Sequence, residues 1–304
     1  MSSSSHGSAA KAIFYAFVAN LGIAIAKSFA AVYTASGSML AEAIHSFADC
    51  GNQVLLYIGL RQSDKPADEE HPLGYGKITY FWSFIVAILL FSIGGMFSIY
   101  EGWHKLQSPE ELNQAWVGLL VLAVSIVLEF LSLKGCLAEI KRLRGDKPFW
   151  KWLKTTRNAE LVVVLGEDNA AIIGLVIAFI FVSMAVFTGN PVYDAMGSIC
   201  IGVVLLVISI FVAWRIKGLI VGRSADPDIR QSIEELIAGD DGIDAVLNTI
   251  TMHMGADIML AAKIRMESGL SLDQAIQRIN ELERKIKKAL PEIKWCFIEP
   301  DIED

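Results

Sequence analysis

Apolar residues along this chain gather in six long stretches separated by polar segments. A helix that crosses a lipid bilayer requires about 20 predominantly apolar residues. Six stretches meet this requirement, at residues 12–33, 39–60, 78–100, 115–133, 159–187 and 192–214. The pattern therefore predicts an α-helical polytopic membrane protein with six transmembrane helices, so that the two ends of the helical region lie on the same side of the membrane.

After Lys217 the pattern changes to the mixed polar and apolar sequence of a soluble domain. Asp226 followed by Pro227 is a helix-start signal, and Ser271 with Gln274 forms a capping box. The predicted elements are helices over 227–238 and 271–290 and strands over 246–254, 258–266 and 294–298. We therefore expect an N-terminal tail over 1–10, a membrane domain over 11–217, and a small cytoplasmic α/β domain of ferredoxin or metallochaperone type over 218–304.

The composition supports a membrane location. Hydrophobic residues make up 54% of the 304 residues and charged residues only 19%, which excludes an ordinary soluble domain. The net charge of −7 is unevenly distributed, because acidic residues gather after Gly218 and basic residues in one loop between predicted helices. The four cysteines stand singly, without a Cys-x-x-Cys pair, and therefore indicate neither a thiolate zinc site nor a disulfide framework.

Basic residues predict the orientation in the membrane. They surround the loops after the second and fourth predicted spans, at Arg61, Lys65, Lys77, Lys134, Lys141, Arg142, Arg144, Lys147, Lys151, Lys154 and Arg157. The opposite loops, near Ser36, Pro109 and Asn190, offer only Lys105. The positive-inside rule therefore places both termini in the cytoplasm. We expect a multi-pass protein of the bacterial inner membrane, with an organelle membrane as the open alternative. Because the basic loop lies beside a span, contact with anionic lipid headgroups is favoured over nucleic acid.

Three ionisable residues, His45, Asp49 and Asp168, lie within otherwise apolar predicted spans. An ionised side chain in a bilayer is costly unless it faces a polar cavity, a partner or a metal. His45 and Asp49 are four residues apart and therefore share one helix face. Counting along each span, Asp49 and Asp168 both lie roughly 15 Å from a membrane surface. The pattern predicts that the three side chains meet at mid-membrane, on an ion pathway.

An imidazole with two carboxylates is typical of sites for first-row divalent ions, zinc above all. Because these ligands bind metal in their deprotonated forms, protons compete with the metal. The residues therefore favour exchange of protons for a divalent metal, and Zn²⁺ is the expected ion. They indicate no separate cofactor. A structural alternative stays open, in which His45 forms a hydrogen bond across helices and each aspartate pairs with a polar neighbour.

Two motifs resemble those of a known family. Residues 34–49 (TASGSMLAEAIHSFAD) resemble the second-span signature of the cation diffusion facilitators, and residues 71–77 (HPLGYGK) resemble the family's His-Pro-x-Gly-x-Gly-Lys/Arg motif. Six spans followed by a small α/β domain also match, so the resemblance covers nearly the whole chain. It implies a homodimeric secondary transporter, not an enzyme, that alternates between inward-facing and outward-facing states and exports a divalent metal in exchange for protons.

The resemblance also implies a ligand set. The family's transport site takes two ligands from the second span, here His45 and Asp49, and two from the fifth, where Asp168 fills the downstream position. The upstream position holds Val164, which cannot bind metal. Glu167 could complete the site if the helix is locally rotated, or could face a polar interface, since adjacent helix residues point about 100° apart. The missing ligand leaves manganese, iron and cobalt as alternatives to zinc.

Weaker metal-site candidates lie outside the spans. Asp68 and His71 are three residues apart in a loop, but Tyr75 stands where the resembled family has a second histidine, which favours a solvated acidic loop. His253 is a further candidate. Carboxylates that could join it in a weak site are those of Asp257, Glu299 and Asp301. We expect the C-terminal domain to dimerise, together with the transmembrane helices, and to hold few or no strong metal sites.

Other polar residues of the spans have structural interpretations. Hydrogen bonds between helices are expected for Glu42, Asn20, Asn52 and Asn169, with orientation of a metal ligand as the alternative role. Lys27 is expected to extend its ammonium group to the membrane surface. Glu129 and Asp194 lie near the ends of predicted spans, which predicts interfacial positions for both.

Two other functions are compatible with three metal ligands. An intramembrane metalloenzyme would use the open fourth position to activate water, although the chain has no His-Glu-x-x-His motif. A metal sensor would bind the ion without releasing it on the far side. Metal flux in the absence of any other substrate distinguishes transport from both.

Overall fold

The computed structural model describes residues 3–108 and 114–303, with their side chains except those of 3–16, 19 and 160. The chain divides into two compact units. The first consists of Met1–Arg61, Phe81–Lys147 and Ala159–Lys217. The second consists of Gln62–Tyr80, Pro148–Asn158 and Gly218–Asp304. The second unit therefore contains two interhelical segments in addition to the region predicted as the C-terminal domain.

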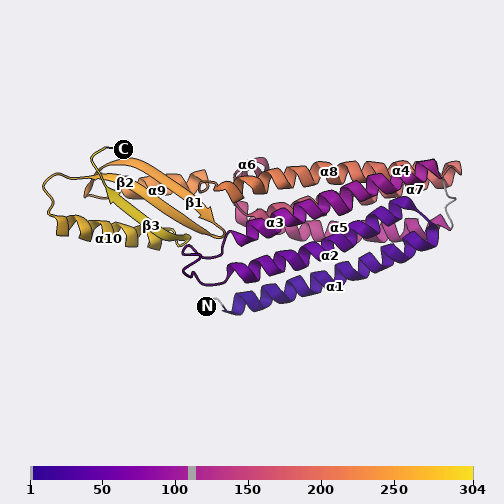
Figure 1. Cartoon of the computed structure of the whole chain (residues 1–304), viewed down its shortest axis with the longest axis horizontal. Helices are drawn as coiled ribbons and strands as arrows, with labels where there is room; N and C mark the ends of the chain where they lie inside the picture. Colours follow the sequence, from indigo (N-terminus) through magenta and orange to yellow (C-terminus); the bar gives the residue numbers. More distant parts are fainter. Residues whose placement is uncertain (1–2, 109–113, 304) are drawn as a thin grey trace. The chain divides into compact units, whose positions relative to one another are not determined.

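Long helices build the first unit (Figure 1). They are α1 (Ser3–Thr34), α2 (Gly37–Ser63), α3 (Ile78–Leu89), the π-helix η1 (Leu90–Met96), α4 (Phe97–Gln107), α5 (Ala115–Arg144), α7 (Ala159–Thr188) and α8 (Val192–Val221). The predicted tail is helical from Ser3 onward, whereas its first two residues and the predicted loop position Pro109 lie outside the described residues. Each predicted span thus corresponds to a helix or to the continuous run from α3 to α4.

Four of these helices, within the described part of the chain, are long and apolar enough to cross a membrane. They are Ile78–Gln107, Ala115–Arg144, Leu161–Thr188 and Val192–Val221. The first two predicted spans correspond to α1 and α2, which contain 32 and 27 residues. Because α2 carries Glu42, His45 and Asp49 in its interior, its apolar character is diluted by the residues of the candidate site.

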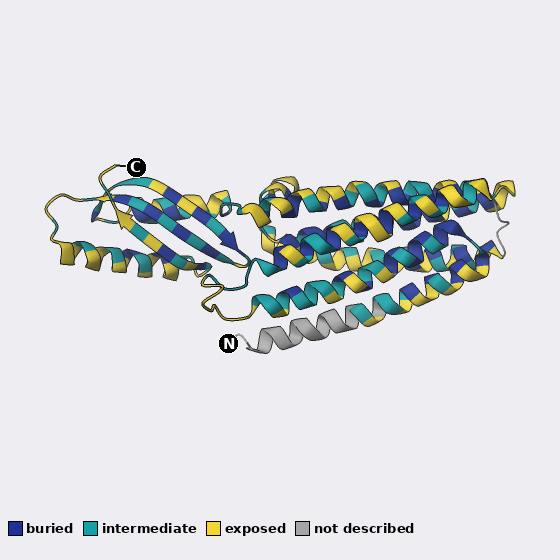
Figure 2. Ribbon diagram, in the orientation of Figure 1, coloured by how far each residue is buried: buried dark blue, intermediate teal, exposed yellow. Residues whose placement is uncertain are grey.

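Glycine residues allow helices of the first unit to pack closely. A Cβ atom added at Gly102 of α4 would lie 2.7 Å from the Ala195 carbonyl oxygen of α8, and one added at Gly202 of α8 would lie 2.7 Å from the Gly95 carbonyl oxygen of η1. Glycine therefore allows these backbones to approach, as small residues commonly do between membrane helices. Buried residues of α1, α2, η1, α5, α7 and α8 form one apolar core, visible as the inward-facing dark positions in Figure 2.

The start of α2 is capped by Asp194 from α8. Asp194 Oδ1 accepts hydrogen bonds from Ser36 Oγ at 2.7 Å and from the Ser38 amide at 3.2 Å, and Oδ2 accepts one from the Gly37 amide at 2.6 Å. A carboxylate at this position satisfies amides that a helix leaves unpaired and interacts favourably with the helix dipole. Asp194 is in the first turn of α8, near the span end as predicted, and is 2% exposed because it packs against the start of α2.

The second unit contains a three-stranded sheet with two longer helices (Figure 1). Its elements are α6 (Phe149–Thr155), α9 (Pro227–Ala238), β1 (Ile243–Met254), β2 (Asp257–Met266), α10 (Leu272–Ala289) and β3 (Ile293–Pro300). β2 lies in the centre, antiparallel to β1 and parallel to β3. Asp226 caps α9, and the capping box of Ser271 and Gln274 is present.

One face of this sheet forms the core of the second unit. Burial alternates along β2, as expected for a strand covered on one side. Buried residues of the two helices, such as Ile233 of α9 and Ile286 of α10, pack with Ile258, Leu260 and Ile264 of β2. The opposite face carries exposed side chains, described with the site below.

The β1–β2 turn lies against the segment that precedes α3, within the same unit. The Tyr80 hydroxyl donates to the Gly255 carbonyl oxygen at 3.0 Å and accepts from the Gly255 amide at 3.1 Å. A Cβ atom added at Gly76 would lie 1.9 Å from the Met254 carbonyl oxygen, so only glycine fits there. The last glycine of the HPLGYGK motif thus has a structural role in this contact.

Candidate functional site

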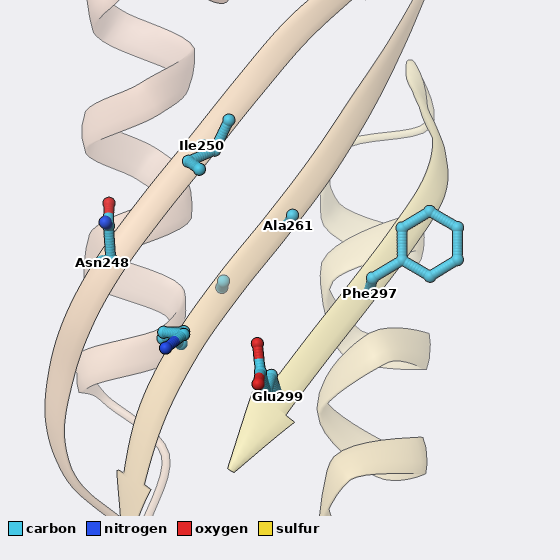
Figure 3. Close-up of a pocket in the computed structure, with 7 residues that line it drawn as sticks. Asn248, Ile250, Ala261, Phe297 and Glu299 are labelled. Atoms are coloured by element: carbon cyan, nitrogen blue, oxygen red, sulfur yellow. The ribbon is translucent and has the colours of Figure 1, made fainter. Parts of the chain in front are cut away.

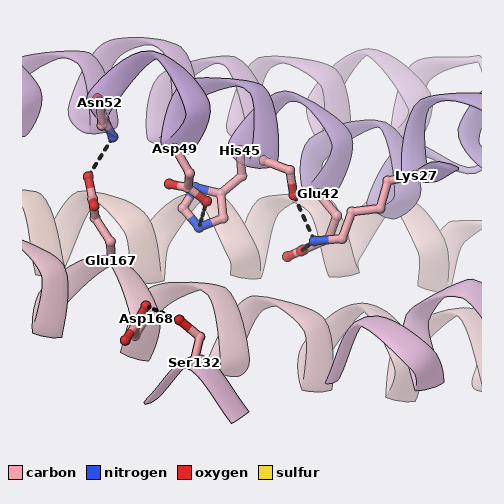
Figure 4. A network of polar contacts seen from close by, with 9 residues as sticks. Lys27, Glu42, His45, Asp49, Asn52, Ser132, Glu167 and Asp168 are labelled. Atoms are coloured by element: carbon pink, nitrogen blue, oxygen red, sulfur yellow. Dashed lines mark hydrogen bonds and ion pairs between the residues drawn. The ribbon is translucent and has the colours of Figure 1, made fainter. Parts of the chain in front are cut away.

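His45 and Asp49 share one face of α2, as their spacing predicts. The His45 Nε2 atom lies 3.6 Å from Asp49 Oδ2, and the side chains are 0% and 14% exposed. Within the described residues, neither ring nitrogen of His45 has a hydrogen-bond partner, and Asp49 Oδ1 has none either. Figure 4 shows both side chains pointing from α2 towards the helices that carry Glu167 and Ser132. These atoms are therefore buried polar groups that the described protein atoms leave unsatisfied.

Asp168 and Glu167 point away from each other, as neighbours on a helix do. Asp168 Oδ1 accepts a hydrogen bond from Ser132 Oγ of α5 at 3.4 Å, and Oδ2 has no hydrogen-bond partner among the described residues. Glu167 Oε1 accepts one from Asn52 Nδ2 of α2 at 2.6 Å (Figure 4). Of the two roles considered for Glu167, the structure therefore has it at a polar interface with α2.

The three predicted ligands do not form a closed cluster in this structure. Among the described residues, no group of three or more His, Cys, Asp or Glu side chains is close enough to hold a metal ion. Asp49 and Asp168 are nevertheless near enough to interact electrostatically. The structure therefore joins His45 to Asp49 and leaves Asp168 nearby, facing α5. Binding of one ion by all three would require their side chains to move together.

Glu129 of α5 belongs to this region, although the sequence pattern predicted an interfacial position. α5 continues to Arg144, beyond the predicted end of the span at Leu133, so that Glu129 lies at the middle of the helix. Its carboxyl group interacts electrostatically with both Asp49 and Asp168.

Lys27 is fully buried and does not reach the membrane surface, contrary to prediction. Its Nζ atom lies 3.2 Å from Glu42 Oε2 and 2.8 Å from Ser46 Oγ, and both charged side chains are 0% exposed. The ammonium group therefore joins α1 to α2, one turn from His45 (Figure 4). The predicted interhelical hydrogen bonds of Glu42 and Asn52 are confirmed, whereas the Asn169 amide donates within α7, to the Leu165 carbonyl oxygen at 2.6 Å.

Asp68 and His71 lie together in an exposed loop of the second unit. The Asp68 carboxylate accepts from the His71 amide at 2.7 Å and from the Tyr75 hydroxyl at 2.6 Å. The Tyr75 hydrogen bond is the main reason why the pKa of Asp68 lies below its ordinary value. Tyr75, in place of a histidine, thus occupies a carboxylate oxygen that a metal would need, which agrees with the solvated loop expected here.

His253 of β1 is buried, and neither of its ring nitrogens has a hydrogen-bond partner among the described residues. Burial lowers the pKa of His253 below its ordinary value, which favours the neutral imidazole. The carboxylates considered as its partners have other contacts, because Asp257 pairs with Lys294 at 3.0 Å and Asp301 with Lys263 at 2.9 Å. The structure therefore does not gather the candidate carboxylates around His253.

The open face of the three-stranded sheet carries a pocket (Figure 3). Its lining residues are Asn248, Ile250, Ala261, Ala262, Lys263, Phe297 and Glu299. Ile250 of β1 and Phe297 of β3 are large apolar side chains that are 57% and 56% exposed on this face. Glu299, a metal-site candidate from the sequence, lies on this face and not beside a gathered set of ligands.

Comparison with known proteins identifies both parts of the chain. The model of the cation efflux transmembrane domain matches residues 13–216, and that of the cation efflux protein cytoplasmic domain matches residues 225–302. The predicted fold class, a helical membrane domain followed by a small α/β domain, is confirmed by these matches and by the elements described above.

Three relatives illustrate the range of the similarity. The mitochondrial proton-coupled zinc antiporter SLC30A9 of Xenopus laevis is 33% identical over 280 residues, which cover 91% of this chain and 49% of that protein. The magnetosome protein MamB of a Magnetospira species is 22% identical, with 93% and 91% covered, and the cation-efflux pump FieF of Escherichia fergusonii is 23% identical, with 87% and 83% covered. The chain thus spans about half the length of the SLC30A9 proteins.

Proposed function

Because the chain belongs to the cation diffusion facilitator (cation efflux) family, we propose that it exports a divalent metal cation from the cytoplasm in exchange for protons. The ion is bound by His45, Asp49 and Asp168 in the middle of the membrane unit. The relatives named as antiporters and efflux pumps support transport rather than catalysis. Zn²⁺ is the first substrate to test, followed by Mn²⁺, Fe²⁺ and Co²⁺, because the ligand set contains one imidazole.

The observation that carries this proposal is the set of unsatisfied polar atoms. Buried polar atoms in proteins are nearly always hydrogen-bonded, since an unpaired one costs about 1–3 kcal/mol. Here both nitrogens of His45, Oδ1 of Asp49 and Oδ2 of Asp168 have no such partner within the described residues. All four atoms are acceptable ligand atoms for a divalent ion. One cation bound by a single His45 nitrogen and by the two carboxylate oxygens would satisfy three of these atoms, because the two nitrogens of an imidazole point in different directions.

The same ligands supply the exchange with protons. An imidazole or carboxylate must be deprotonated to bind metal, so arrival of the metal displaces protons and arrival of protons releases the metal. In the present arrangement Glu167, not Asp168, faces α2 through Asn52. We propose that α7 rotates during the cycle, which brings Asp168 towards Asp49 when the Glu167–Asn52 hydrogen bond breaks.

Transport is tested with inside-out vesicles that contain the full chain. Asp49→Ala and Asp168→Ala are expected to abolish Zn²⁺ uptake driven by a proton gradient, while the protein still elutes as a single folded species. Glu139→Gln is a matched control, because Glu139 lies on α5 and pairs with the exposed Arg142. Unchanged uptake in both aspartate variants would refute the assignment of the site.

We also propose that the protein forms a homodimer through the open face of its sheet, where Ile250 and Phe297 are exposed (Figure 3). The match to the cytoplasmic domain model, which is named for dimerisation, supports this assembly. Ile250→Asp with Phe297→Asp is expected to lower the dimer fraction measured by light scattering in detergent. Leu272→Asp is the control, since Leu272 is 76% exposed at the start of α10. A dimer fraction equal to wild type would place the interface elsewhere.

We propose a bacterial inner membrane location with both termini in the cytoplasm. The basic loops support this orientation, because positive residues near the ends of spans remain on the cytoplasmic side. Reporter fusions to each predicted loop test this orientation, and a periplasmic signal from a fusion after Arg144 would reverse it.

A further inference from the structure

Glu129 stands in the middle of α5, and the half of the helix that precedes it carries no charged residue. It follows the start of α5 at Ala115 by 14 residues and precedes the end at Arg144 by 15, and it is half-buried. α5 is one of the helices long and apolar enough to cross a membrane. A carboxylate at such a depth is retained where it faces a cavity, a partner or an ion rather than lipid.

The orientation of α5 brings Glu129 towards the candidate site. Glu129, Ser132 and Cys136 are three and four residues apart and therefore lie on one helix face. Ser132 donates a hydrogen bond to Asp168 at 3.4 Å, and the Cys136 thiol interacts electrostatically with Asp168. The face of α5 that carries Glu129 is thus the face directed at Asp168 of α7.

Three carboxyl groups, one each from α2, α5 and α7, lie near one another. Of the charged groups around them, Glu129 interacts most strongly with both Asp49 and Asp168. Like charges repel strongly where the surroundings are apolar, so three carboxylates are held together at low cost only when protons or a cation neutralise them. Lys27 already donates to Glu42 and Ser46.

A second observation concerns the unsatisfied atoms of His45. His45 is completely buried, and both of its ring nitrogens are without a hydrogen-bond partner in the described part of the chain. Figure 4 shows its ring pointing from α2 into the space that Asp49 and Asp168 border. A metal ion bound by the imidazole would therefore lie among the carboxylates.

We infer that Glu129 of α5 is a fourth ligand of the transported cation, in the place that Val164 cannot fill. The inference rests on the proposed transport function. It means that α5 supplies a ligand in addition to α2 and α7. It makes the ligand set one imidazole and three carboxylates, which is richer in oxygen than a set with two imidazoles. Oxygen ligands suit harder ions such as Mn²⁺, so the site is able to accept Mn²⁺ as well as Zn²⁺.

The test compares neutral replacements that differ in their ability to bind metal. Glu129→Gln removes a ligand, whereas Glu129→His removes the same charge but supplies an imidazole. Affinities for Zn²⁺ and Mn²⁺ are measured by calorimetry on the full chain in detergent, and KM by metal-driven proton flux in proteoliposomes. Glu139→Gln, on the same helix, is the control.

If Glu129 is a ligand, Glu129→Gln weakens binding of both metals at least about tenfold. Glu129→His recovers Zn²⁺ affinity but not Mn²⁺ affinity, an outcome that a structural role of the carboxylate does not produce. Wild-type affinity and KM for both metals in Glu129→Gln overturn the inference. If Glu129→Gln aggregates, the test rests on Glu129→His. The inference is then overturned if the ratio of Zn²⁺ affinity to Mn²⁺ affinity in Glu129→His is no higher than in the wild-type protein.

The outcome separates this inference from the proposed function. Loss of flux in Asp49→Ala with normal binding and flux in Glu129→Gln rejects only the role of Glu129. Absence of metal flux in the wild-type protein, or normal flux in both Asp49→Ala and Asp168→Ala, rejects the transport site itself.

Discussion

Two buried polar regions of the membrane unit differ in whether their atoms are satisfied. At the start of α2, both carboxylate oxygens of Asp194 accept hydrogen bonds, and its carbonyl oxygen accepts another from Ser38. Farther along α2, buried atoms of His45 and Asp49 have none within the described residues. Burial and residue type are similar in the two places. The comparison teaches that the state of the hydrogen bonds, more than the presence of charge, separates a structural carboxylate from a candidate ligand.

The Lys27–Glu42 pair lies between these extremes. Glu42 Oε2 contacts the Lys27 ammonium group, whereas Glu42 Oε1 has no partner among the described atoms and approaches α7 where Gly174 leaves space. A Cβ atom at position 174 would lie 2.4 Å from that oxygen. The pair therefore joins α1, α2 and α7 one turn from the candidate ligands.

The largest contrast is expected between function and stability at His45. His45→Ala should abolish Zn²⁺ flux in proteoliposomes, because the only imidazole of the site is lost. The loss of unfolding free energy should be limited to the cost of the cavity that the imidazole leaves, about 2–4 kcal/mol, since no hydrogen bond disappears. Thermal melting of the detergent-solubilised protein measures the second quantity. A large loss of stability with flux retained would make His45 a structural residue.

Lys27→Met should have the next largest effect, this time on stability. Removing one member of a buried ion pair leaves an unpaired charge and typically costs about 3–5 kcal/mol. Lys27→Met combined with Glu42→Leu should recover much of this loss, because both charges are then absent. Melting temperatures of the two variants provide the comparison, and equal temperatures would show that the pair is not coupled.

Asp194→Ala should destabilise the protein by about 2–3 kcal/mol, because it leaves the Gly37 and Ser38 amides unsatisfied. Metal affinity measured by calorimetry on the folded fraction should remain close to that of wild type. A weakened affinity with unchanged melting would contradict the separation between the cap and the site.

The sequence predicted the second unit more completely than the site. The caps at Asp226 and Ser271 are local signals, and both helices begin where those residues indicate. The short helix α6 was not predicted, since its seven residues lie in a charged segment without a cap that binds the first turn. Local chemistry is thus readable where an element's start depends on neighbouring residues.

The burial of Lys27 and Asp194 was not predicted from the sequence. Both were assigned by their distance from the end of an apolar stretch, whereas each side chain is buried against a neighbouring helix. The direction of Glu167 depends on Asn52, which is 115 residues away in the chain. Packing between distant segments decides such contacts, and one sequence does not contain that information.

The smallest effect is expected at the exposed Asp68. Tyr75→Phe removes the hydrogen bond that chiefly lowers the pKa of Asp68, so this pKa should rise towards its ordinary value. Because the folded-state pKa is depressed, the contribution of Asp68 to stability is present above its unfolded-state pKa and is lost as pH falls through the folded-state value. An NMR titration of ¹³C-labelled aspartate carboxyls measures the shift. An unchanged pKa would mean that the hydroxyl does not bind the carboxylate in solution.

The most direct test of the central claim is the position of the metal itself. Anomalous diffraction at the zinc edge, from crystals of the full chain grown with Zn²⁺, should give a peak within coordination distance, about 2.0–2.2 Å, of a His45 nitrogen and of Asp49 and Asp168 oxygens. A strong peak elsewhere in the membrane unit, with those three side chains unbound, would contradict the account.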